Sequence, residues 1–206
     1  LLPETVLAFG AACGVAGLVY LAAMVNPLTG LLGALTLTIY LFVYTPLKRI
    51  TWLNTWVGAI PGALPPLLGW VAARNAITLE GAALFAIQFL WQIPHFLAIA
   101  WLYREDYAQA GFRMLSVHDP TGRQTGLCAV GFAGLLLVVS LAPTAWGIAG
   151  PAYLFSALIL GLLFVGAAGR FAHTLTLRHS RQLFWASILY LPLLLGVLVL
   201  DKSRLY

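Results

Sequence analysis

The sequence predicts an all-α protein, a polytopic transmembrane helical bundle, and three observations support this fold class. Of its 206 residues, 62% are hydrophobic and only 8% are charged, whereas a soluble domain usually carries about 25% charged residues. Seven apolar stretches are long enough to cross a bilayer, which takes roughly 17–25 residues. Turn-forming residues separate these stretches. The composition therefore excludes an ordinary soluble domain, a disordered chain and a disulfide scaffold.

The expected spans cover residues 5–25, 28–43, 54–73, 79–103, 125–146, 149–169 and 183–200. Asn26-Pro27 separates the first two spans, and Arg74-Asn75 ends the third. Pro46 follows the second span, and we expect it to interrupt the helix there. The longer polar connections are then residues 44–53, 104–124 and 170–182.

The basic residues predict which loops share one side of the membrane. With seven spans, the N-terminus and the three polar loops lie on one side. That side holds Lys48, Arg49, Arg104, Arg113, Arg123, Arg170, Arg178 and Arg181, and the other holds Arg74, Lys202 and Arg204. The positive-inside rule places the more basic side in the cytoplasm or its equivalent. The net charge of +5 reflects these loops, so we expect no nucleic-acid partner.

A first polar cluster runs from Tyr44 to Asn54. Tyr44 and Lys48 are four residues apart, so one helical turn places both side chains on the same face. Together with Arg49 they have the chemistry to hold a diphosphate. The alternative is that the two cations only anchor the end of a span by reaching the interface.

A second polar cluster begins inside the fourth span. Gln92 and His95 lie three residues apart, on one helical face, and polar groups at membrane depth favour a functional hypothesis. His95 has two interpretations: a satisfied interhelical hydrogen bond, or a ligand or proton carrier that faces a cavity, such as an axial ligand to a haem iron.

Charged residues follow at the end of that span. Glu105 and Asp106 offer the oxygen ligands that Mg²⁺ prefers, with Arg104 and Tyr107 beside them. The alternative is a solvated loop edge with an Arg–Glu pair. These residues alone predict either an enzyme for an anionic, partly apolar substrate or a transporter.

Two segments carry a resemblance to a known family. The first is YTPLKRITWLNTWVGAIPGALPPLLGW, Tyr44 to Trp70, and the second contains W-Q-x-P-H-F followed by D-Y-x-x-A-G-x-x-M-L, within Phe89 to Leu115. Both resemble the haem O synthase (protohaem farnesyltransferase) branch of the UbiA family of intramembrane prenyltransferases. The resemblance implies a UbiA-type bundle of nine spans around a central cavity, of which about seven are present here.

The family's first acidic motif, N-x-x-x-D-x-x-x-D, is absent before Tyr44, and the chain starts at Leu1. We therefore expect residues 1–206 to form a single membrane-embedded prenyltransferase domain that is incomplete at its N-terminus, with uncertain activity on its own.

The resemblance also implies a reaction. A farnesyl group moves from farnesyl diphosphate to a vinyl group of haem b, giving haem O for haem A and terminal oxidases. Mg²⁺ binds with the diphosphate, and haem b is a substrate rather than a cofactor. Expected partners are farnesyl diphosphate, haem b, the lipid bilayer and a haem A synthase. The expected location is a bacterial or mitochondrial inner membrane, with the active-site loops on the cytoplasmic or matrix side.

Residue roles are implied only where the motifs match. Lys48, Tyr44 and Asp106 are the expected catalytic residues, and Asp106 and Glu105 the expected metal ligands. The expected substrate-binding residues are Arg49, Asn54, Gln92, His95, Arg104, Tyr107 and Arg113.

Two alternatives remain open. One is a related prenyltransferase that acts on a quinone or chlorophyll precursor. The other is a non-catalytic haem-binding or transport protein of the membrane, with which the helix-interrupting prolines of the third span are compatible.

Overall fold

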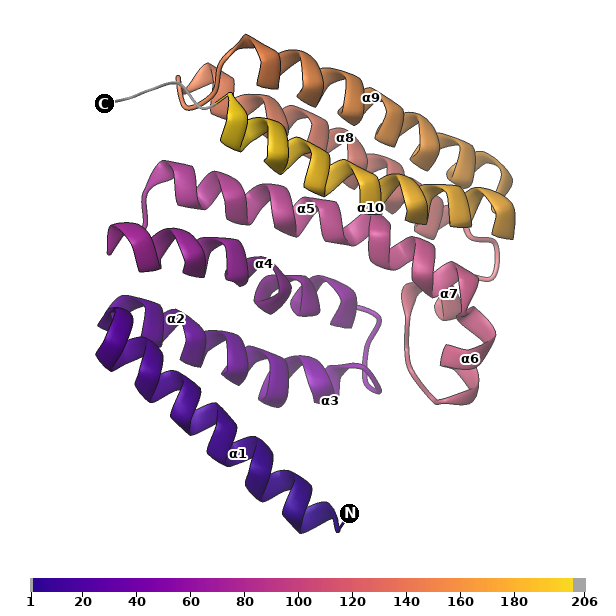
Figure 1. The fold of residues 1–206 in the computed structure, drawn as a ribbon. Helices are drawn as coiled ribbons and strands as arrows, with labels where there is room; N and C mark the ends of the chain where they lie inside the picture. The colour runs from indigo at the N-terminus through magenta and orange to yellow at the C-terminus, as the bar shows by residue number, and fades with distance from the viewer. Residues whose placement is uncertain (1, 202–206) are drawn as a thin grey trace.

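The computed structural model describes residues 2–201, and long helices that lie side by side dominate it (Figure 1). In chain order the elements are α1 (Pro3–Tyr20), η1 (Leu21–Val25), α2 (Pro27–Thr38), η2 (Ile39–Tyr44), α3 (Thr45–Leu47), α4 (Asn54–Arg74), α5 (Leu79–Leu102), α6 (Arg104–Gln109), α7 (Leu115–His118), α8 (Arg123–Ala145), α9 (Pro151–Thr174) and α10 (Leu177–Leu200). Within residues 2–201, seven stretches of 21 to 24 residues are long and apolar enough to cross a membrane. The seven predicted spans are confirmed, and the protein is an integral membrane protein.

The last span begins earlier than predicted, at Leu177 rather than at residue 183. The hydroxyl of Thr176 accepts a hydrogen bond from the backbone N–H of His179 and so caps the new helix. The polar residues that suggested a loop, Arg178 and Arg181 among them, instead form the first turns of α10. Only two residues, 175 and 176, separate α9 from α10.

Pro46 does not interrupt the helix, contrary to the sequence-based expectation. The helical backbone continues to Leu47, through the π-helical stretch Ile39–Tyr44. Proline has no N–H to donate, and it lies in the first turn of α3, where the helix returns from the π register to the α register. A change of register therefore accommodates Pro46 without ending the span.

The corner between the first two spans is fixed by one buried side chain. Asn26 accepts a hydrogen bond at Oδ1 from the backbone N–H of Thr29, at 2.8 Å, and so caps α2. Its amide Nδ2 donates to the carbonyl of Val71 in α4, at 3.1 Å. One asparagine thus both starts a helix and joins the N-terminal spans to the rest of the bundle.

The main core lies among α5, α8, α9 and α10, where small side chains such as Ala129, Ala133, Ala157 and Ala168 are fully buried. Small residues let transmembrane helices approach closely. α1, in contrast, buries none of its residues. Its apolar surface is suited to a lipid environment, where exposed apolar side chains carry no penalty.

The polar connections gather at one end of the bundle. Figure 1 shows the link between α3 and α4, the small helices α6 and α7, and the short turn between α9 and α10 at the same end. The predicted alternation of the loops is therefore confirmed. Leu1, Lys202 and Arg204, which the sequence-based predictions used, lie outside the described residues.

Candidate active site

One backbone hydrogen bond and several side-chain hydrogen bonds join the two polar loops at this end of the bundle. The N–H of Arg113 donates to the carbonyl of Lys48, at 2.8 Å. The guanidinium of Arg113 reaches the carbonyl of Ile50, at 3.4 Å. The segments that carry the two sequence motifs, far apart in the chain, therefore form one continuous surface.

Asn54, the first residue of α4, adds further hydrogen bonds to this junction. It is fully buried, and its Nδ2 donates both to the carbonyl of Thr51, at 2.7 Å, and to the carbonyl of Arg113, at 2.8 Å. Its Oδ1 is buried without a hydrogen-bond partner. The amide hydrogens of this expected substrate-binding residue are thus used within the protein, and only Oδ1 is left for another donor.

Lys48 and Tyr44 lie together, as the four-residue spacing predicts. The Nζ of Lys48 is 4.3 Å from the centroid of the Tyr44 ring and 5.8 Å from that of Tyr40. Aromatic faces attract an ammonium group, so the two rings hold the lysine at the end of the span. Gly58 of α4 allows this arrangement, because a Cβ there would lie 2.5 Å from the Tyr44 ring.

Tyr107 approaches the same cluster from α6. Its ring packs against Phe112, with centroids 6.1 Å apart, and its phenol lies close enough to Tyr44 for the two groups to interact electrostatically. Burial, with a smaller contribution from Tyr103, raises the pKa of Tyr107. The phenol therefore stays protonated at neutral pH and remains a hydrogen-bond donor for an anion.

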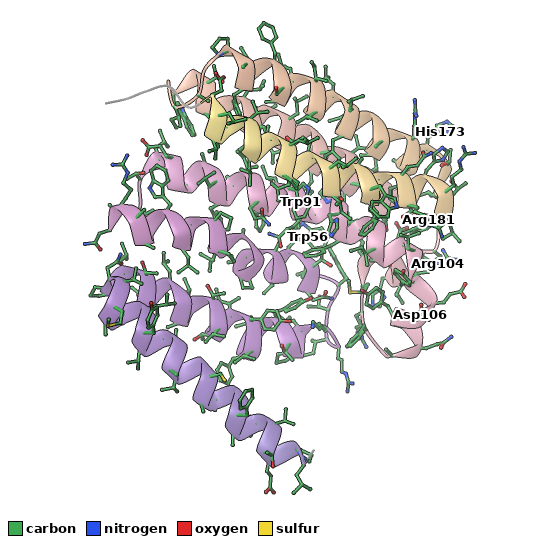
Figure 2. All side chains as sticks on the ribbon, in the orientation of Figure 1. Trp56, Trp91, Arg104, Asp106, His173 and Arg181 are labelled. Atoms are coloured by element: carbon green, nitrogen blue, oxygen red, sulfur yellow. The ribbon has the colours of Figure 1, made fainter. Side chains whose placement is uncertain are left out.

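Arg104, Glu105 and Asp106 line a neighbouring hollow of about 190 Å³, together with Trp101, Leu102, Gln109 and Leu177. The Arg104 guanidinium lies over the Trp101 ring, 5.0 Å from its centroid. Figure 2 shows Arg104 and Asp106 at the same end of the bundle as His173 and Arg181. Cations and carboxylates thus meet where α5 ends and α10 begins.

The donor set at this hollow fits a magnesium ion that is bound together with a substrate. Among residues 2–201, no three His, Cys, Asp or Glu side chains form a group that would hold a metal alone. Mg²⁺ commonly uses only one or two carboxylates and takes the remaining oxygens from substrate phosphates and water. The exposed carboxylates of Glu105 and Asp106 suit that arrangement.

Gln92 and His95 reach different neighbouring helices, although they were expected on one face. Gln92 is 3% exposed, and its Nε2 donates to the carbonyls of Ala59, at 3.4 Å, and Gln88, at 3.2 Å. The Nδ1 of His95 instead lies 2.7 Å from Ser187 Oγ of α10. Three residues turn an α-helix by about 300°. The two side chains therefore leave α5 about 60° apart around its axis, which is enough for them to contact different helices.

Sequence reasoning did not identify Ser187 or Phe184 as part of this region. Both lie in α10, and the ring of Phe184 stacks on His95, with centroids 5.2 Å apart. A single serine in an apolar span is a weak signal, because serine often only bonds the preceding turn of its own helix. Only the packing of α5 against α10 reveals their proximity to His95.

Comparisons with known proteins agree with these features. The chain is 50% identical over 199 residues to the protoheme IX farnesyltransferase of Solibacter usitatus, a match that covers 97% of this chain and 68% of that protein. It is 46% identical to that of Koribacter versatilis, with 92% and 63% covered. It is 39% identical to the mitochondrial protoheme IX farnesyltransferase of Homo sapiens, with 97% and 45% covered. The chain thus spans about two thirds of the length of these bacterial relatives.

A solved structure, from work on digeranylgeranylglyceryl phosphate synthase in membranes, has the same fold. Its TM-score is 0.79 at 18% identity, and the match covers 94% of this chain and 67% of that one. At this identity the likeness concerns the fold alone. The model of the UbiA prenyltransferase family matches residues 1–197. The chain therefore belongs to the UbiA prenyltransferase family.

Proposed function

We propose that the protein transfers a farnesyl group from farnesyl diphosphate to a vinyl group of haem b and so forms haem O. The observation that carries this proposal is the 50% identity, over 97% of the chain, to a protein named protoheme IX farnesyltransferase. The junction between the two motif-bearing loops and the neighbouring hollow support it, since together they hold cations, phenols and carboxylates at one end of an apolar bundle.

Lys48, Arg49 and the Tyr44 phenol hold the diphosphate in this proposal. Lys48 is partly buried against aromatic rings, whereas Arg49 is exposed. Fixed cations and O–H donors stabilise the charge that develops on the leaving group. Mg²⁺, when bound by Asp106 and Glu105, supplies further neutralisation of that charge. The connection between α5 and α8 contributes further groups to the diphosphate in this proposal: Tyr107, Arg104 and Arg113.

The bond changes in the transfer are simple. The C1–O bond of the farnesyl diphosphate breaks, and its electron pair leaves on the diphosphate. The π electrons of the vinyl group then form a new C–C bond to the allylic cation. Water captures the resulting haem-stabilised cation and releases a proton, which leaves a hydroxyl group on the product. The apolar interior of the bundle excludes water until this last step.

Gln92 and His95 lie deeper in the bundle and contact the haem in this proposal. Seven residues of helix separate His95 from the end of α5 at Leu102, which is about 10 Å of depth. The polar loops face the cytoplasm or matrix of an inner membrane, following the positive-inside rule. A haem A synthase is the proposed recipient of the product.

The direct test uses the purified protein in lipid nanodiscs with haem b, farnesyl diphosphate and Mg²⁺. Haem O, separated by chromatography and identified by its mass, is the expected product. Replacing farnesyl diphosphate by geranylgeranyl diphosphate, or haem b by a quinone precursor, tests the alternative substrates. Prenylation of a quinone precursor, with no haem O formed, would overturn the proposal.

A further inference from the structure

The environment of His95 fixes both the plane and the orientation of its ring. Trp91 stacks on the imidazole with centroids 4.8 Å apart and planes 16° apart, and Phe184 does so at 5.2 Å and 23°. The indole N–H of Trp91 donates to the carbonyl of Ser187, at 2.8 Å, which ties this aromatic group to α10. Figure 2 shows Trp91 in the middle of the bundle. Because two rings stack on the imidazole, only its edges remain available for polar contacts.

The hydrogen bonds of Ser187 determine the tautomer of His95. The Ser187 hydroxyl donates its one proton to the carbonyl of Phe184, at 2.5 Å. Its oxygen must therefore accept a hydrogen bond from His95 Nδ1, which lies 2.7 Å away. The imidazole thus carries its proton on Nδ1, and Nε2 presents a lone pair.

Nε2 of His95 is also accessible. His95 is partly exposed, and Nε2 has no hydrogen-bond partner in the part of the chain that the structure describes. It is not among the buried polar atoms that lack a partner, which are Asn54 Oδ1, Trp70 Nε1, Thr144 Oγ1 and Tyr153 OH. Nε2 is therefore an unused acceptor that is not enclosed by the described protein atoms.

We propose that His95 Nε2 is the axial ligand of the haem iron of the substrate, and that Ser187 is the positioning residue that sets its tautomer. This inference rests on the proposed function. Histidine ligands commonly donate their second ring N–H to an acceptor, which fixes the ring and increases the basicity of the ligating nitrogen. The Nδ1–H bond to Ser187 is such a contact. Anchoring the iron also holds the macrocycle while one vinyl group meets the farnesyl cation.

Metal-free porphyrin gives the sharpest test, because protoporphyrin IX has the shape of haem b but no iron. Both are titrated into the protein in nanodiscs, and the dissociation constants are compared. We expect haem b to bind at least about tenfold more tightly than protoporphyrin IX. In His95→Ala this ratio should fall to about one, and added imidazole should restore the visible spectrum of a nitrogen-ligated haem. His173→Ala, an exposed histidine at the end of α9, should behave as the unchanged protein.

Equal ratios in the unchanged protein and in His95→Ala, with the same haem spectrum, would overturn the assignment. His95→Gln provides a second variant, in case the alanine variant does not fold. If haem O still forms without a ligation spectrum, the ligand role fails while the proposed function stands. If the spectrum depends on His95 but no prenyl transfer occurs, the proposed function fails instead.

Ser187 has a matched control on the same helix. Ser180 lies seven residues earlier in α10, and its hydroxyl donates to the carbonyl of Ala98 in α5, at 2.9 Å. Ser187→Ala should weaken haem b binding about tenfold, with little effect on protoporphyrin IX, and shift the haem spectrum. Ser187→Thr keeps the hydroxyl and should restore binding, whereas Ser180→Ala should leave the haem spectrum unchanged. An unchanged spectrum in Ser187→Ala would refute the positioning role.

Discussion

The side-chain amide of Asn54 donates a 2.8 Å hydrogen bond to the carbonyl of Arg113, 59 residues later in the chain. A second donated bond, to the carbonyl of Thr51, commits both of its amide hydrogens. The backbone bond from Arg113 to Lys48 lies beside them. Lys48 is the proposed diphosphate ligand. The position of its backbone therefore depends on the loop that carries Arg113, which Asn54 holds in place.

Asn54→Asp should therefore lower both stability and activity. A carboxylate would face the carbonyls of Thr51 and Arg113 and donate no hydrogen bond to either. Each lost bond costs about 1 kcal/mol, and a buried group left unsatisfied adds about 1–3 kcal/mol. We expect a lower unfolding temperature in detergent and a lower kcat at temperatures where the variant remains folded.

The matched control is Asn75→Asp. Asn75 is exposed, in a left-handed conformation (φ 51°) at the end of α4, where aspartate is also tolerated. It should keep the unfolding temperature and the kcat of the unchanged protein. If Asn54→Asp matches this control in both measurements, the junction does not support the site.

Lys48→Met should cripple prenyl transfer without unfolding the protein. Methionine keeps an unbranched apolar side chain of similar length and removes the ammonium group that lies over the Tyr44 and Tyr40 rings. Loss of one preorganised group that stabilises the developing charge costs roughly 10²–10³ in kcat. Steady-state haem O formation at saturating Mg²⁺ measures this. A rate within about twofold of the unchanged protein would remove Lys48 from the mechanism.

Asp106→Asn should raise the Mg²⁺ concentration needed for half-maximal activity. The amide keeps the size of the side chain but removes the charge that attracts a hard cation. A chelator should abolish the activity of the unchanged protein, and excess Mg²⁺ should restore it. Asp106→Asn should need about tenfold more Mg²⁺. Full activity of Asp106→Asn at low Mg²⁺ would place the ion elsewhere.

Apolar length and turn residues were enough to predict seven spans and their common polar end, because both depend on local composition. The Tyr44–Lys48 contact also followed from helical spacing. Pro46 and the start of α10 were misjudged, since a π-helical register and a threonine cap depend on particular hydrogen bonds. Ser187 could not be predicted, because its role arises only where α10 packs against α5.

The buried carboxylate of Asp119 should stabilise the folded protein to an extent that depends on pH. It is 5% exposed, and its Oδ2 accepts from the N–H and the hydroxyl of Thr125, at 2.8 and 3.0 Å, in the first turn of α8. Burial by itself would raise the pKa of Asp119, but the hydrogen bonds from Thr125 and Thr121 outweigh it and lower the pKa below its usual value.

A lowered carboxyl pKa stabilises the folded state above the unfolded value of about 3.9, and this stabilisation is lost as pH falls through the folded value. Asp119→Ala should cost about 0.5–2 kcal/mol at pH 7. The difference in unfolding temperature between the two proteins should persist from pH 7 to 5 and shrink below pH 4. A difference that stays constant down to pH 3 would contradict this account.

α8 and α9 approach each other closely at Gly126, and a larger residue there should destabilise the protein. A Cβ at Gly126 would lie 2.8 Å from the Cα of Ala172 and 3.0 Å from its Cβ. Backbone atoms cannot rotate away, so Gly126→Ala forces the two helices apart and should destabilise the fold by about 1–3 kcal/mol. The control is Gly131→Ala, five residues further along α8, where a Cβ would meet no atom within 4 Å. This substitution should be neutral or slightly stabilising because alanine favours the helix. Unfolding temperatures in the same detergent compare the two variants, and equal values would mean that this close approach does not hold α8 against α9.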